Sequence, residues 1–164
     1  MKSVLMIALS FLCQTALAQF EEGDLLPDID LPGVDGEHIK LSSLRGQMVF
    51  VDFWASWCKP CRKENPEIRK AYLAYKDEEF DNGEGFTVYS VSLDKSREAW
   101  EKAVIRDGLV WKNHVSDLKG WKNEVAQAYG VRSIPHTVLL DAEGKIIKTI
   151  ISGKSVKEEV IENM

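Results

Sequence analysis

Cysteine and histidine are scarce in this chain, which has three of each among its 164 residues. A structural zinc site needs about four cysteine or histidine ligands, usually supplied by two closely spaced pairs. The sequence has a single closely spaced cysteine pair, Cys58 and Cys61, and its histidines are scattered. The pattern therefore argues against a structural zinc site.

Long apolar runs, clusters of positive charge and low-complexity tracts are also missing. A membrane-spanning helix needs roughly 20 consecutive apolar residues, and no run in the sequence approaches that length. The net charge is −5 and the basic residues are dispersed, which argues against nucleic-acid binding. The composition of the whole chain, 45% apolar and 29% charged, is that of an ordinary soluble protein. Its length suits one domain with its own core.

The N-terminus carries a pattern typical of a secretory signal peptide. Lys2 provides a positive start, Val4–Leu12 is an uncharged apolar run, and small residues follow in Ala16–Ala18. This order of charged, apolar and small residues predicts cleavage just before Gln19. Residues 1–18 are then a signal peptide.

This N-terminus has two alternative fates. The apolar run could remain as an anchor, although it is about half the length of a membrane span. Cys13 could carry a lipid, but bulky Leu12 stands where a bacterial lipoprotein signal has a small residue. We therefore expect residues 19–164 to be a single periplasmic or otherwise extracytoplasmic domain. In that oxidising compartment Cys58 and Cys61 can form a disulfide.

Hydrophobic periodicity and turn residues predict an α/β protein with the order β-α-β-α-(β)-α-β-β-α. Parallel strand–helix–strand units come first and a hairpin comes last, which predicts a mixed central β-sheet with helices on both faces. A Pro- and Gly-punctuated segment at 19–47, with a turn at 34–37, precedes the sheet. The predicted strands are 48–54, 86–93, 111–115, 136–140 and 145–151, and the predicted helices are 58–79 (kinked at Pro66), 95–106, 121–129 and one opening at 155.

The segment Cys58-Lys59-Pro60-Cys61 lies where the first long strand passes into a helix. The free N–H groups and the dipole at a helix N-terminus favour a thiolate, so Cys58 is predicted to be the exposed nucleophile of low pKa. Cys61 follows one turn later on the same face and is predicted to resolve the mixed disulfide. A purely structural disulfide is the alternative, but it would close only two intervening residues.

Two acids are candidates for moving protons at this pair. Asp52 interrupts an apolar strand six residues before Cys58. Burial raises the pKa of a carboxyl group, which suits it to exchange a proton with Cys61. Glu64 lies three residues after Cys61 on the same helical face, where it could also be a solvated acid that favours the helix dipole.

The segment Phe53–Cys61, together with Ile134 and Pro135, resembles the thioredoxin superfamily. The stretches Gly23–Pro27 and Leu41–Gly46 are similar to its exported TlpA/ResA-like branch. The resemblance covers roughly residues 21–163. It implies a thioredoxin-like fold with an N-terminal extension.

The resemblance also assigns residues to the site. It implies a cis peptide bond at Pro135, facing the disulfide, and pairing of the Ile134 backbone with an extended substrate. Independently of the resemblance, Trp57, next to the first cysteine, is predicted to pack around the site and is a candidate for substrate binding there. Thioredoxins have an acid at the position of Asp52, and the ResA-like branch has one at that of Glu64. The proton role therefore stays open between these two acids, or is shared by both.

The predicted function is that of an exported thiol–disulfide oxidoreductase that needs no cofactor beyond its own cysteine pair. The resemblance implies reduction of disulfides in other extracytoplasmic proteins, with cytochrome c maturation as the role this branch most often suggests. It also implies a membrane-embedded thiol reductase as electron donor. Two alternatives stay open. Disulfide oxidants or isomerases usually carry a helical insertion or a dimerisation domain, and Cu(I)-delivery proteins space their cysteines by three residues and add a histidine from another loop.

Overall fold

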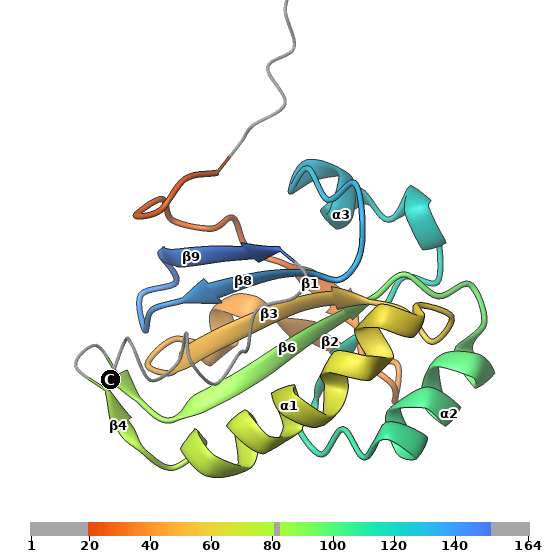
Figure 1. The fold of residues 1–164 in the computed structure, drawn as a ribbon. Coiled ribbons are helices and arrows are strands. Elements are labelled where there is room, and N and C mark those ends of the chain that lie inside the picture. Colours follow the sequence, from red (N-terminus) through yellow and green to blue (C-terminus); the bar gives the residue numbers. More distant parts are fainter. Residues whose placement is uncertain (1–19, 81–82, 152–164) are drawn as a thin grey trace, which may run out of the picture.

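The computed structural model describes residues 20–80 and 83–151 (Figure 1). The predicted signal peptide and the helix predicted to open at residue 155 lie outside the described residues. Near the start, β1 (Asp30–Pro32) and β2 (His38–Lys40) form an antiparallel pair around the predicted turn. A short 3-10 helix, η1 (Leu41–Leu44), follows and leads into the main sheet.

The main sheet has five strands in the order β7-β6-β3-β8-β9. The central strand β3 is parallel to β6 and antiparallel to β8, while β6 and β7 are parallel and β8 and β9 antiparallel. This arrangement confirms the predicted mixed sheet. The strand bounds are β3 Met48–Trp54, β6 Phe86–Ser92, β7 Asn113–Val115, β8 His136–Leu140 and β9 Ile146–Ile151.

Two helices, α1 (Lys59–Tyr75) and α2 (Arg97–Asp107), lie on the same side of the sheet and contact each other (Figure 1). The chain then passes through η2 (Gly120–Lys122) and α3 (Glu124–Ala128) before it reaches β8. In the part of the chain that the structure describes, no helix is long and apolar enough to cross a membrane.

The first helix differs in one respect from the sequence prediction. It runs without a break through Pro66 but ends at Tyr75 rather than near Glu79. The following residues form a small antiparallel pair instead, β4 (Glu79–Phe80) with β5 (Gly83–Glu84). The Gly85 N–H donates to the carbonyl of Glu78 at 2.8 Å, so a backbone partner outside the helix competes for this segment.

Burial around β3 fixes the position of the loop that follows it. Every residue of β3 and of β6 is buried, and Phe53 and Trp54 have no exposed surface. Burying an aromatic side chain of this size stabilises the fold by roughly 1.5–3 kcal/mol. The end of β3 is thus held rigidly in the core, and the chain leaves it directly into the turn that carries the cysteines.

Candidate redox site

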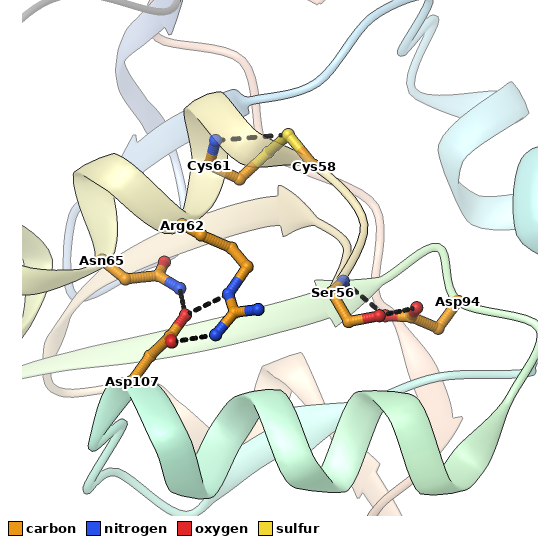
Figure 2. The surroundings of a disulfide bond; sticks show 7 residues. All are labelled: Ser56, Cys58, Cys61, Arg62, Asn65, Asp94 and Asp107. Carbon is orange, nitrogen blue, oxygen red and sulfur yellow. Dashed lines mark hydrogen bonds and ion pairs between the residues drawn. A yellow bond between two sulfur atoms is a disulfide. The ribbon is translucent and has the colours of Figure 1, made fainter.

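Cys58 and Cys61 are joined by a disulfide at the start of α1 (Figure 2). Cys58 is the N-cap residue of the helix, and its sulfur accepts a hydrogen bond from the Cys61 N–H at 3.2 Å. Pro60 lies in the first turn, where the missing N–H has no helical partner to lose. The structure therefore confirms that the cysteine pair opens a helix and that a backbone N–H is directed at the first sulfur.

The predicted exposure of Cys58 is wrong for this disulfide-bonded state. Cys58 is 3% exposed and Cys61 is 2% exposed, so accessibility does not distinguish the two residues. In the disulfide the Cys58 sulfur lies against the first turn of α1, where it caps the backbone. The difference between the cysteines lies in this capping position, because Cys58 precedes the helix and Cys61 lies within it.

The loop between β3 and α1 is fastened to the end of β6 by Asp94, as Figure 2 shows. Asp94 is buried, and its carboxylate accepts hydrogen bonds from the backbone N–H of Ser56 at 2.8 Å and its hydroxyl at 2.6 Å. The Ser92 hydroxyl donates a third bond at 2.7 Å. These bonds hold the backbone two residues before Cys58.

Replacing Asp94 with alanine is expected to lower the free energy of unfolding by about 3 kcal/mol, because three donors lose a charged acceptor in a buried place. Urea unfolding of the oxidised protein measures this effect. Asp117→Ala is the control, because that carboxylate accepts one backbone bond in an exposed turn. A loss no greater than that of the control would show that Asp94 does not stabilise the loop.

A second set of polar contacts joins α1 to α2 just beyond the cysteines. Arg62 donates from Nε to Asp107 at 2.8 Å and also from its terminal nitrogen, and the Asn65 amide donates to the same carboxylate at 2.8 Å (Figure 2). Partial burial alone would raise the pKa of Asp107, but the bonds from Arg62 and Asn65 hold it below its usual range. The first turns of α1 are therefore fixed to α2.

The Ile134–Pro135 peptide bond is cis, as the resemblance implies. Pro135 is buried and immediately precedes β8, whose first residue, His136, pairs with Phe53 near the end of β3. This register brings the proline segment to the edge of the sheet from which the cysteine loop departs. Burial lowers the pKa of His136, which favours its neutral form at neutral pH.

Asp52 is buried in the middle of the sheet, opposite Ser90 on β6 and Thr137 on β8. Burial is the main cause that raises its pKa, and the negative charge of Glu64 raises it further, to about 8. The two predicted acids, Asp52 on β3 and Glu64 on α1, therefore interact electrostatically. Glu64 itself is only partly buried.

Two cavities border Ser56 and Trp57. One, of about 450 Å³, is also lined by Leu93, Gly120 and Trp121, and the rings of Trp57 and Trp121 lie 6.4 Å apart. The other, of about 560 Å³, is lined by charged side chains of α1 and α2. Trp57 is 53% exposed, so it is available to a partner beside the disulfide. Across the described residues, no group of three histidine, cysteine or acidic side chains is placed to hold a metal ion.

Comparison with known proteins shows which family this chain belongs to. The Redoxin family profile matches residues 21–164. The chain belongs to the Redoxin family. Curated relatives in this family include the thiol-disulfide oxidoreductase ResA of Geobacillus thermodenitrificans, which is 30% identical over 98% of this chain and 90% of its own length. The ResA protein of Geobacillus kaustophilus is 33% identical over 84% of this chain and 73% of its own length.

Solved structures of Redoxin relatives have the same fold. The thioredoxin domain of a Bacteroides vulgatus thiol-disulfide oxidoreductase is 35% identical, with a TM-score of 0.77 over 88% of this chain and 98% of its own. A thiol:disulfide interchange protein from Bacteroides sp. is also 35% identical, with a TM-score of 0.76 over 87% of this chain and 90% of its own. This Redoxin chain is therefore a ResA-like thiol–disulfide oxidoreductase of thioredoxin-like fold.

No local sequence motif marks the residues that hold the site in place. Asp94 and Ser56 are 38 positions apart, and Arg62 and Asp107 are 45 apart, so neither pair belongs to a local motif. One signal was available for Asp94. It directly follows a predicted buried strand, and the carboxyl ends of neighbouring parallel strands meet at the same edge of a sheet.

Proposed function

We propose that this chain reduces disulfides in other extracytoplasmic proteins. The Cys58 thiolate attacks one sulfur of the client disulfide, a mixed disulfide forms, and the client's other sulfur leaves as a thiolate. Cys61 then gives up its proton and attacks the Cys58 sulfur, which releases the client's remaining thiolate. Two electrons pass to the client, and the Cys58–Cys61 disulfide is left to be reduced by a donor dithiol.

One observation supports this direction, namely the position of Glu64 on the helix that begins at the cysteine pair. Cys61 and Glu64 share a face of α1, and the charge of Glu64 acts on buried Asp52. The negative charge of Glu64 near the pair disfavours the thiolates of the reduced state, so the dithiol gives up electrons readily. The neighbouring lysines oppose this effect only weakly, because Lys59 and Lys63 are exposed and screened by solvent.

The reduction potential of the Cys58–Cys61 couple tests the proposed direction. We expect a value near or below about −270 mV, in the range of thioredoxin. The measurement is equilibration of the protein with redox buffers of known potential, with the dithiol and disulfide forms quantified by mass spectrometry after alkylation. A value near about −120 mV would assign the chain to the oxidants instead.

The location that we propose is extracytoplasmic, after removal of residues 1–18, with a membrane-embedded thiol reductase as the electron donor. Clients in cytochrome c maturation fit this proposal, since the resemblance points to that branch.

The mature protein is expected to begin at Gln19, because Ala16 and Ala18 present the cleavage site. Intact-mass analysis of the exported protein measures this. A lipid-modified Cys13 at the N-terminus would overturn the prediction and indicate membrane anchoring.

A further inference from the structure

The charged cavity beside the disulfide is unusual in a chain with a net charge of −5. It has a volume of about 560 Å³ and lies between the first turns of α1 and the end of α2. Four cationic side chains, Lys59, Arg62, Lys63 and Arg106, line it, against the single acid Asp107. Positive charge is thus concentrated next to the reactive cysteines of an otherwise acidic protein.

The acid in this cavity is already neutralised. Both oxygens of Asp107 accept hydrogen bonds from Arg62, and Asn65 donates to one of them as well. Neither Lys59 nor Lys63 forms an ion pair within residues 20–80 and 83–151. Arg106 adds to the positive field around Asp107. Asp107 therefore balances the charge of Arg62 only, and the positive charges of Lys59, Lys63 and Arg106 are in excess within the cavity.

The cavity is placed to meet a partner that reacts at the disulfide. Ser56 and Trp57, which directly precede Cys58, form part of its wall. An extended segment advances about 3.3 Å per residue. A client whose cysteine reaches Cys58 can therefore place the side chains of residues two or three positions away at this cavity. Because Trp57 also lines the cavity, a client side chain that enters the cavity lies next to the Trp57 ring.

From this geometry we infer that the cavity binds the carboxylates of acidic residues that flank the target cysteine of a client protein. The inference rests on the proposed reductase function and names the class of disulfide that it favours. An aspartate or glutamate near the client cysteine supplies the negative charge that balances the excess positive charge of the cavity. The attraction speeds encounter and orients the segment over Cys58.

Three synthetic peptide disulfides test this inference. They share one sequence but carry glutamate, glutamine or lysine at the positions two and three residues from the target cysteine. We expect kcat/KM to fall from the glutamate to the glutamine to the lysine peptide, by about three- to tenfold at each step at low ionic strength. Salt should reduce these differences, because the cations are exposed.

Matched variants locate the effect on the protein. Lys63→Gln with Arg106→Gln removes two cavity charges, and we expect it to bring the glutamate-to-glutamine ratio close to one. Lys70→Gln with Lys102→Gln removes the same charge from the outer surfaces of α1 and α2, where these lysines pair with Glu67 and Glu98, and should leave the ratio unchanged. Lys59 stays unaltered, because it lies between the two cysteines and a substitution there changes the redox-active segment itself.

The outcomes separate the two proposals. Equal rates for the three peptides, or a preference that survives in the Lys63→Gln/Arg106→Gln variant, would overturn the inference while the reductase function stands. A failure of the parent protein to reduce any of the three would contradict the proposed function itself, and the inference with it. The reduction potential of each variant is measured in parallel, so that a changed couple is not mistaken for changed recognition.

Discussion

Replacing Cys58 with serine is expected to lower the turnover of a protein disulfide by about three orders of magnitude or more, because the nucleophile is lost. Replacing Cys61 with serine has a different result. Cys58 still attacks once, but no thiol is left to resolve the intermediate, so the protein accumulates as a mixed disulfide with its substrate. The assignment rests on Cys58 being the helix N-cap residue, with the Cys61 N–H directed at its sulfur.

Non-reducing electrophoresis followed by mass spectrometry of the trapped adduct measures this difference. The double variant Cys58→Ser/Cys61→Ser is the control for adducts that do not involve the pair. An adduct formed through Cys61 in the Cys58→Ser protein would reverse the two roles. That result would be informative, since exposure does not separate the two cysteines in the disulfide-bonded state.

Replacing Asp52 with asparagine is expected to slow disulfide reduction near neutral pH by about tenfold to a hundredfold. This loss should be larger than that caused by Glu64→Gln. Asp52 has a pKa of about 8 because it is buried and close to the charge of Glu64. Its basic form, which can accept the Cys61 proton, therefore increases as the pH rises toward 8. The parent should show this rise in rate and the Asp52→Asn protein should lack it.

The control for this experiment is Glu64→Gln, which removes the smaller of the two effects on Asp52. Its rate profile should shift toward lower pH, because the pKa of Asp52 falls when the neighbouring charge is removed. The titrations of the two acids are coupled, so the profile belongs to the pair. Parental profiles for both variants would remove both acids from the proton pathway. A larger loss in Glu64→Gln would assign the role to Glu64.

The same substitution should make the protein more stable. The folded-state pKa of Asp52 is above its unfolded value, so the folded state holds a proton that the unfolded chain releases. Stability from this group is present below pH 4 and is lost as the pH rises toward 8. Asp52→Asn has no such loss, and its free energy of unfolding at pH 7 should exceed the parental value by about 2–4 kcal/mol. Urea unfolding at pH 4.5 and 7 measures the difference, which should be small at the lower pH.

The sequence was sufficient for the parts of the fold that depend on local patterns. Continuous apolar runs located β3 and β6, and the turn at 141–144 located the final hairpin. The end of α1 was misplaced because the pairing of β4 with β5 depends on residues beyond the helix. The hydrogen bonds of Asp94 were missed for a similar reason, since a contact between the ends of two strands depends on the register of the sheet.

If the chain is the reductase that we propose, the low exposure of both cysteines has a consequence for its electron donor. The attacking thiolate of the proposed donor must reach the sulfur of Cys58, a residue that is only 3% exposed, at a helix start held by Asp94 and by the bonds of Asp107 to α1. Because this enzyme has little freedom to adapt, the donor must present its cysteine on a projecting segment. A donor that first has to open locally, at a cost of about 2.8 kcal/mol, would react about a hundredfold more slowly than one whose cysteine is already extended. The folding stability of the donor around its cysteine would then help to set the rate at which the Cys58–Cys61 disulfide is reduced.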